Sequence, residues 1–363
     1  DPGAPKMPDL AAAYPAMALV LAKAGLLAPL DALFTETELA AYLPQFLDEG
    51  RLQDGRLYVF PAAKSTEALF VNKVFFDRFS AATGIGVERL STFEGLAAAA
   101  LEYYRWTDSL TPDVPGDGRA FFTADSWFNI ALVGAAQLGG NFAGPGGLDT
   151  GADTFKRIWD ISALPAITGS FAVSDNYSSD LARTGEIVCS LGSTAGVLFY
   201  GDTVTYPDNT SEKAEYLILP YPVFEGGRKT ALQRGAGMVA AKSTPQREAA
   251  AALFLKWFTA PDQNMRFVSS TGYLPVTAEA FGKQMAAEIE AAENTALRRL
   301  MEAATRMYED YDFITAPNLD GIDALTRSYE AALKQAMREG RRRTAAGEDP
   351  DAVSRELFPA FAR

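Results

Sequence analysis

The chain has 363 residues, of which 48% are hydrophobic and 22% charged. This is an ordinary globular composition, long enough for two domains that each bury a core. The net charge of -13 disfavours nucleic acid and anionic lipid as partners, because their phosphates would be repelled. The sequence has no histidine and one cysteine, Cys189, which excludes an intrachain disulfide, the usual zinc and copper sites and catalysis by Ser-His-Asp or Cys-His groups. We expect no metal and no cofactor.

The most apolar stretch, AMALVLAKAGLLAPLDALF, is interrupted by Lys23, Gly25, Pro29 and Asp31. It falls short of the roughly 20 apolar residues that a membrane-spanning helix needs, and is better interpreted as an amphipathic helix that ends at the glycine. No basic region precedes it, so it is not a convincing signal peptide. We expect any export signal to be absent from this sequence.

Helix and strand patterns alternate along the chain. They predict, in order, a helix over 14–24, the strand LYVFPAA from Leu57, the strand and helix of EALFVNKVFFDRF, the helices TFEGLAAAALEYYRW and ADSWFNIALVGAAQ, a helix over 155–161, the strands GEIVCSLGS, AEYLILPYPVF and GAGMVAAKST, and the helix TPQREAAAALFLKWF. From residue 278 onward the pattern is mostly helical. This alternation favours an α/β fold.

Punctuating residues support several of these helices. Thr92 is a candidate N-cap, Asp125 or Ser126 caps the next helix, and Thr244 precedes a proline at the first helical position. Trp159 and Trp257 lie inside helices at apolar spacing, which favours core packing. The run 341–343, three arginines among acids, favours a solvated helix face rather than a nucleic-acid patch.

Three segments carry a resemblance to a known family: KSTEALFVNKVFFDRF, GEIVCSLGSTAGV and RGAGMVAAKSTPQREAAAALFLKWFTAPDQNMRFVSSTGYLPVTAEAF. In this order and spacing they resemble the extracellular solute-binding proteins of ABC importers, the maltose-binding-like family that includes oligosaccharide and glycerol 3-phosphate binders. The resemblance extends from Pro8 to about Phe281, and its most specific parts are STGYLPV and the ST and LFVNK pair.

The resemblance implies a two-lobe periplasmic-binding-protein fold with a discontinuous chain and a cleft between lobes that closes by a hinge. Residues 1–115 and 235–280 would form the N-terminal lobe, and residues 116–234 and 281–363 the C-terminal lobe. In the family a first strand and helix precede MPDLAAAYPAMALVLAKAGLLAPLD, and this sequence starts without them. We expect that unit to lie outside the sequence given, since its loss would expose a sheet edge; a shortened member is the alternative.

The implied function is high-affinity binding of a small hydroxylated solute, a carbohydrate or polyol, phosphorylated or not, and its delivery to the membrane permease of an ABC importer. The protein would be a periplasmic or extracellular monomer, with lipid anchoring before processing left open, and no enzyme. A glycoside hydrolase using two carboxylates is the rival, because Glu67, Asp125, Glu186 and Glu225 need no histidine, although no pair forms a recognisable constellation. A scaffold or adhesion protein without a small ligand is the third alternative.

Sugar binding needs aromatic rings for the C–H faces and fixed polar groups for the hydroxyls. Positions at loops and element ends that match the family pattern supply both kinds of group. The candidate ligand-binding residues are Tyr14, Lys64, Ser65, Thr66, Trp127, Ser193, Arg234, Gly235 and Tyr273.

Each candidate has a structural alternative. Tyr14 could pack on the core at a helix start, residues 64–66 could form a plain hairpin turn, Trp127 could anchor the core, and Ser193 could cap the next helix. Tyr273, on a stiff Gly-Tyr-Leu-Pro turn, is interpreted as a ligand wall. The missing side chain of Gly235 would let a ligand approach the backbone. The phosphate-reading arginine of glycerol-phosphate binders has no clear match, but Lys64 and Arg234 keep an anionic ligand open.

Overall fold

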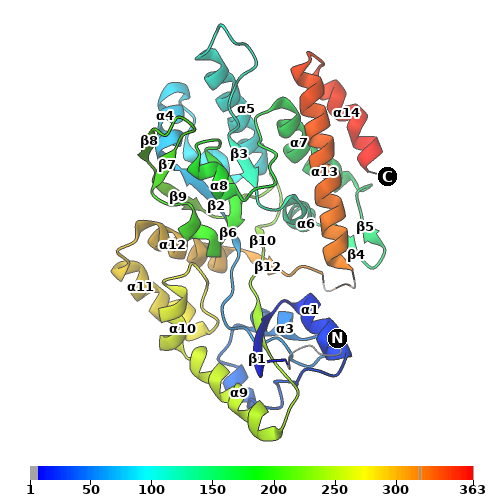
Figure 1. Ribbon diagram of the computed structural model, residues 1–363, viewed down its shortest axis with the longest axis vertical. Helices are drawn as coiled ribbons and strands as arrows, with labels where there is room; N and C mark the ends of the chain where they lie inside the picture. The colour runs from blue at the N-terminus through cyan, green and yellow to red at the C-terminus, as the bar shows by residue number, and fades with distance from the viewer. Residues whose placement is uncertain (1–6, 318, 320, 363) are drawn as a thin grey trace. The chain divides into compact units, whose positions relative to one another are not determined.

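A computed structural model of the chain describes residues 7–317, 319 and 321–362. Its helices and strands form a mixed α/β fold, which confirms the predicted class (Figure 1). Internal contacts divide the chain into two compact units. Unit 1 comprises the described residues up to Thr66 together with Gln233–Thr305, and unit 2 comprises Glu67–Leu232 and the described residues from Arg306 onward.

These boundaries differ from the predicted ones in two places. Residues 67–115 were assigned to the first lobe, but they belong to unit 2. The reason is that β2 (Glu67–Asn72) is an inner strand of the four-stranded sheet of unit 2, and the helices that follow it lie in the same unit. Residues 281–305 were assigned to the second lobe. They belong to unit 1, in which the helical turn over 280–284 packs on the helix over 261–268 and on the helix over 285–291.

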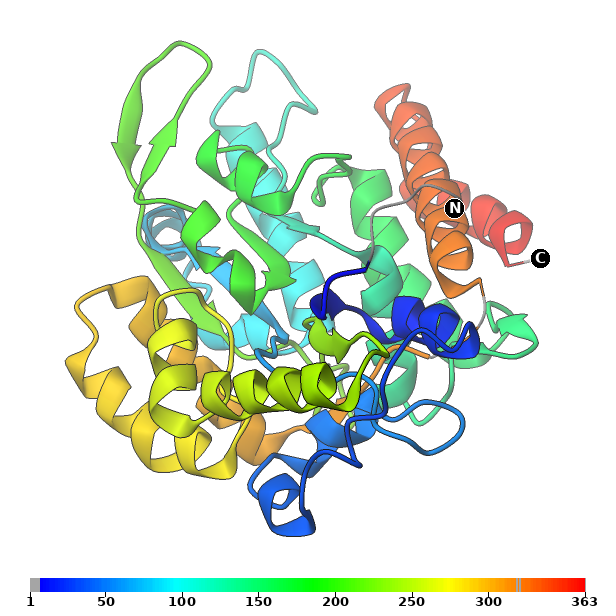
Figure 2. The same cartoon turned by 60° about the horizontal axis from the view of Figure 1, so that its bottom comes forward.

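Unit 1 is built on a short antiparallel pair of strands with helices around it. Its elements are β1 (Leu10–Ala13), α1 (Pro15–Lys23), α2 (Glu36–Leu39), α3 (Pro44–Gly50), β11 (Gly237–Ala240), α9 (Pro245–Phe258), α10 (Pro261–Val268), the π-helical turn η3 (Ala280–Gln284), α11 (Met285–Ala291) and the first part of α12 (Thr295–Asp310). In β1 and β11, Ala13 lies opposite Gly237. Helices α9, α10, η3 and α11 pack against one another in succession (Figure 2).

Unit 2 contains a four-stranded sheet in the order β3-β6-β2-β9, with β3 parallel to β6 and the other neighbours antiparallel. Its elements are β2, α4 (Lys73–Thr83), η1 (Val87–Ser91), α5 (Phe93–Ser109), β3 (Phe122–Ala124), α6 (Trp127–Gln137), β4 (Ala143–Gly144), β5 (Gly147–Leu148), α7 (Asp153–Thr168), α8 (Ser178–Arg183), β6 (Cys189–Ser193), η2 (Thr194–Phe199), β7 (Thr203–Thr205), β8 (Ser211–Lys213), β9 (Tyr216–Leu219), β10 (Thr230–Leu232), β12 (Asp312–Ile314), α13 (Ile322–Ala345) and α14 (Pro350–Phe361). Cys189 is buried in β6, as the apolar run predicts.

Local sequence signals explain where several helices begin. The side chains of Thr92, Ser126 and Thr244 each accept a hydrogen bond from a backbone N–H in the first turn of α5, α6 and α9. These predicted caps are confirmed. The strand predicted from Leu57 is wrong: residues 57–63 form only isolated bridges, and Pro61 lacks the N–H that a continuous ladder requires.

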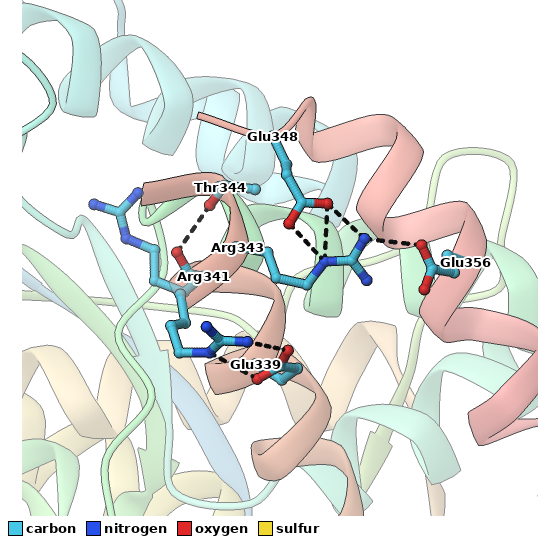
Figure 3. A network of polar contacts seen from close by, with 7 residues as sticks. Glu339, Arg341, Arg343, Thr344, Glu348 and Glu356 are labelled. Atoms are coloured by element: carbon cyan, nitrogen blue, oxygen red, sulfur yellow. Dashed lines mark hydrogen bonds and ion pairs between the residues drawn. The ribbon is translucent and has the colours of Figure 1, made fainter. Parts of the chain in front are cut away.

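Two of the three arginines in the run 341–343 make contacts inside unit 2. Arg343 lies between the carboxylates of Glu348 and Glu356, with N–O distances of 2.6 and 2.8 Å, and so ties α13 to α14 (Figure 3). Its side chain is only 18% exposed. Arg341 donates to the Tyr104 hydroxyl at 2.9 Å. The prediction of a solvated face is therefore wrong for these two side chains.

Candidate functional site

Four of the predicted residues of unit 1 meet along one line of backbone pairing. Tyr14 directly follows β1, whose last residue pairs with Gly237 shortly after Arg234. Arg234 exchanges two backbone hydrogen bonds with Ser65, at 2.7 and 3.0 Å. The neighbouring residue of Ser65 pairs in turn with Leu274, next to Tyr273. We call Tyr14, Ser65, Arg234 and Tyr273 the unit 1 edge.

Two aromatic rings of the unit 1 edge reach its surface. Tyr14 is 62% exposed, and its side chain makes no capping hydrogen bond to α1. Tyr273 is half-buried, and its ring stacks on Phe267 with a centroid distance of 5.9 Å and an interplanar angle of 20°. The turn before it uses Gly272 with φ 76°, a left-handed conformation that favours glycine. Both rings are thus at least partly open to solvent, and their contact with a ligand stays a prediction.

Lys64 is not placed to bind an anion. Its side chain is 4% exposed, and its ammonium lies 2.7 Å from Oε2 of Glu49 and donates to the Gly235 carbonyl at 2.9 Å. A buried ammonium paired with a carboxylate in this way has its charge compensated inside the protein. The structure thus gives Lys64 an internal role in place of the predicted ligand contact.

The remaining predictions in this segment are also corrected by burial. Ser65 and Thr66 are buried. Gly235 has φ 97°, and a Cβ added there would lie 2.9 Å from the Ala63 carbonyl oxygen. Its missing side chain therefore makes room for the neighbouring backbone of residues 63–65 and not for a ligand.

In unit 2, the ends of three strands meet at one edge of the sheet. Ser193 ends β6 and lies opposite Glu67 at the start of β2, while Asp125 and Ser126 follow the end of β3, the parallel neighbour of β6. The Ser193 hydroxyl is half-buried and accepts from the Ala195 N–H at 3.3 Å. The capping role is thus present, and the position at the carboxyl end of a strand also suits ligand contact.

Trp127 lies in the core instead of facing a ligand. It is 1% exposed, and its ring centroid is 6.2 Å from those of Phe122 and Phe171. The amides that begin α6 already have an internal carboxylate: the Phe128 N–H donates to Glu330 at 2.8 Å. Core anchoring, the alternative left open by the sequence, describes Trp127, and the helix N-terminus is not open to an external anion.

Sequence reasoning missed an exposed aromatic surface beside Ser193. Tyr177 and Phe199 are 74% and 67% exposed. Their elements are neighbours: α8, which Tyr177 precedes, contacts η2, which ends at Phe199, and the Ser178 hydroxyl lies 3.1 Å from that of Tyr200. Burial and the nearby carboxylate of Asp125 raise the pKa of Tyr200 far above its usual range, so this hydroxyl stays neutral. The available signal was the apolar run 197–200 directly after a strand end.

Three of the carboxylates considered for a glycoside hydrolase each accept a hydrogen bond from a different donor. Asp125 accepts from the Ser178 N–H at 2.9 Å, Glu67 from the Asn129 amide at 2.7 Å, and Glu186 from the Thr184 hydroxyl at 2.7 Å.

The described residues include no group of three or more potential metal ligands. Among the same residues, no helix has the length and apolar character needed to cross a membrane.

Comparison with known proteins assigns the chain to a family. A family profile described as bacterial extracellular solute-binding protein matches residues 2–296. The chain therefore belongs to the bacterial extracellular solute-binding protein family, which confirms the resemblance found in the sequence. The family description places its members outside the cytoplasm, and the family consists of binding proteins. No curated protein sequence matches.

Solved structures share the fold at low sequence identity. UgpB from Mycobacterium tuberculosis in complex with glycerophosphocholine is 17% identical, with a TM-score of 0.70 over 98% of this chain and 83% of that one. The cyclic α-maltosyl-1,6-maltose binding protein from Arthrobacter globiformis is 18% identical, with a TM-score of 0.70 over 98% and 85%. Maltose-bound MalE3 from T. maritima is 16% identical, with a TM-score of 0.67 over 98% and 84%. The two-lobe binding-protein fold is confirmed.

Proposed function

We propose that this protein binds a carbohydrate or polyol outside the cytoplasm and delivers it to the permease subunits of an ABC importer. The observation that carries the proposal is the pairing of exposed aromatic rings with polar groups at a strand end in each unit. Unit 1 offers the exposed Tyr14 and the half-buried Tyr273. Unit 2 offers the exposed Tyr177, which precedes α8, and the exposed Phe199 on η2, the helical turn that Ser193 caps. Rings of this kind stack on the C–H faces of a sugar, and strand-end hydroxyls bond to its oxygens.

A neutral solute is favoured over a phosphorylated one. Of the two cationic candidates, Lys64 is paired with Glu49 inside unit 1. The other, Arg234, lies on the unit 1 edge, where its backbone pairs with Ser65. A phosphate would call for several charge-assisted donors. We therefore propose that Arg234 bonds to hydroxyl oxygens, and that Arg234→Ala weakens the binding of a neutral sugar.

We further propose that no reaction follows binding. Three of the four carboxylates named for a hydrolase, those of Glu67, Asp125 and Glu186, each accept a hydrogen bond from a different donor, and none of these three bonds joins two of them. Maltotriose incubated with the protein should be recovered unchanged by chromatography, and the appearance of maltose or glucose would contradict this part of the proposal.

A thermal-shift screen tests the proposed ligand class. The probes are maltose, maltotriose, sorbitol, glycerol 3-phosphate and glycerophosphocholine, each followed by titration calorimetry where the melting midpoint rises. A solute at 100 times its dissociation constant stabilises the folded state by about 2.7 kcal/mol, which is readily measured. A rise for the neutral probes supports the proposal. A rise only for the two phosphate-bearing probes, or for none, would contradict it.

A further inference from the structure

A compact polar cluster lies directly behind the unit 1 edge. Oε2 of Glu49, on α3, accepts from the Lys64 ammonium at 2.7 Å and from the side-chain amide of Gln233. The same amide donates to the Gln45 carbonyl at 3.1 Å, and Lys64 also donates to the Gly235 carbonyl at 2.9 Å. One carboxylate oxygen thus joins a helix to two separate stretches of chain.

Those two stretches are the places where the chain passes between the units. Lys64 lies two residues before the boundary between Thr66 and Glu67, and Gln233 is the first residue after the boundary that follows Leu232. The predicted binding residues Ser65 and Arg234 are the immediate neighbours of Lys64 and Gln233, and they pair with each other through their backbones. Any shift of either stretch would therefore move a residue of the unit 1 edge.

Stability alone does not explain this cluster. Side chains of similar size and no charge often stabilise a buried position as well as an ion pair does, because burial removes both charges from water. The cluster also leaves the Oε1 atom of Gln233 buried without a hydrogen-bond partner among the described residues, which is unfavourable. What the polar groups provide, and apolar ones would not, is directional bonding that fixes both stretches against α3.

We propose that Glu49 is a positioning residue of the unit 1 edge: its carboxylate clamps two of the segments that connect the units. It thereby fixes the buried backbone of Ser65 and, through the hydrogen bonds of that backbone, holds Arg234 in place for the solute. The role in binding rests on the proposed function, whereas the clamp itself does not. Nothing in this role requires Glu49 to touch the solute.

Hydrogen exchange on the full chain tests the clamp without any ligand. The reporters are the amide N–H groups of Ser65, Arg234 and Leu274, whose bonds span the segments at 3.0, 2.7 and 2.6 Å. In Glu49→Gln, which keeps the size and removes the charge, we expect these three amides to exchange about tenfold faster or more, because Lys64 loses its partner. The amides of the β1 and β11 pair should not change.

A double variant separates positioning from mere stability. Glu49→Gln combined with Lys64→Met removes both charges, so the melting midpoint should return close to that of the wild type. The clamp would still be absent, and the three amides should remain fast. Full recovery of slow exchange in the double variant, or unchanged exchange in Glu49→Gln, would overturn the proposal.

The matched control is Glu38→Gln, which breaks the 2.7 Å pair of Glu38 with Lys256 in the same unit but away from the connecting segments. It should leave the three amides unchanged. For binding, maltose is the probe: its dissociation constant should rise about tenfold in Glu49→Gln and in the double variant, but not in the control. If the wild type binds none of the three neutral probes of the screen, the proposed ligand class fails, while the exchange measurement still decides whether Glu49 clamps these segments.

Discussion

Replacing Tyr273 by alanine is the sharpest test of the unit 1 edge. The ring is half-buried, stacks on Phe267 at 5.9 Å and follows a glycine turn that holds it at the surface. If it also stacks on a sugar, its removal should weaken binding by about 1–3 kcal/mol, the range of an aromatic anchor. That loss corresponds to a rise of the dissociation constant of roughly fivefold to 150-fold.

The effect on stability should be smaller than that of a core ring. Truncating a fully buried phenylalanine to alanine costs about 3–5 kcal/mol, and a half-exposed ring should lose roughly half of that, including its stacking with Phe267. We therefore expect Tyr273→Ala to remain folded at 25 °C. Tyr273→Phe keeps the stacking surface and should bind almost normally if the hydroxyl is not used.

Calorimetric titration with maltose and thermal melts on the same preparations measure the two quantities separately. Trp257→Ala is the control, because this ring belongs to unit 1, is 54% exposed and lies on α9 outside the proposed edge. It should leave the dissociation constant unchanged. A Tyr273→Ala protein that loses several kcal/mol of stability yet binds as the wild type does would refute the ligand-wall interpretation.

Three further substitutions test the surroundings of Gly235, Tyr177 and Arg343. Gly235→Ala should destabilise the protein by about 1–3 kcal/mol in urea unfolding, because a Cβ at φ 97° would meet the Ala63 carbonyl oxygen; an unchanged midpoint would contradict this. Tyr177→Ala should change stability by no more than about 0.5 kcal/mol while weakening maltose binding, since the side chain is 74% exposed; equal affinity in calorimetry would remove it from the site. Arg343→Met should lower the melting midpoint at pH 7. Arg343 lowers the pKa of Glu348 and Glu356 below their usual 4.5 in the folded state, so the ion pairs stabilise the protein above that pH and this stabilisation is lost as the pH falls through the lowered values. The difference in melting midpoint between variant and wild type should therefore disappear in acid. A difference that stays constant with pH would contradict the ion pairs.

Much of the local structure could be predicted because its causes are local. A threonine or serine before an apolar run caps a helix through atoms three residues apart, and the caps at Thr92, Ser126 and Thr244 are where the sequence places them. The unit boundaries could not be predicted in this way. The assignment of β2 depends on its pairing of Glu67 with Ser193, a partner far along the chain that no local pattern reveals.

The candidate site was harder to predict than the fold, because the role of each side chain depends on how deeply it is buried and on which residues of other elements it contacts. Apolar spacing indicates that a helix has an apolar face, but not which face is covered: Trp159 is buried in α7, whereas Trp257 is exposed on α9, against the prediction. Lys64 looked like an anion ligand until Glu49, on a different element, was found to pair with it. Tyr177 was missed because nothing in its own segment distinguishes an exposed ring from a packed one.

The charges of unit 1 connect these observations. A neutral hydroxylated solute gives a protein of net charge -13 no long-range attraction to exploit, so its affinity depends on donors and rings that are already in place before it arrives. Such a site gains more from a lysine that fixes the backbone than from one that points at the solute. The pairing of Lys64 with Glu49 and the Gly235 carbonyl meets that requirement, because the charge serves to hold the neighbours of Ser65 and Arg234. The internal pairing of Lys64 is therefore consistent with the proposed binding of a neutral solute, which needs a fixed backbone more than it needs a free cation.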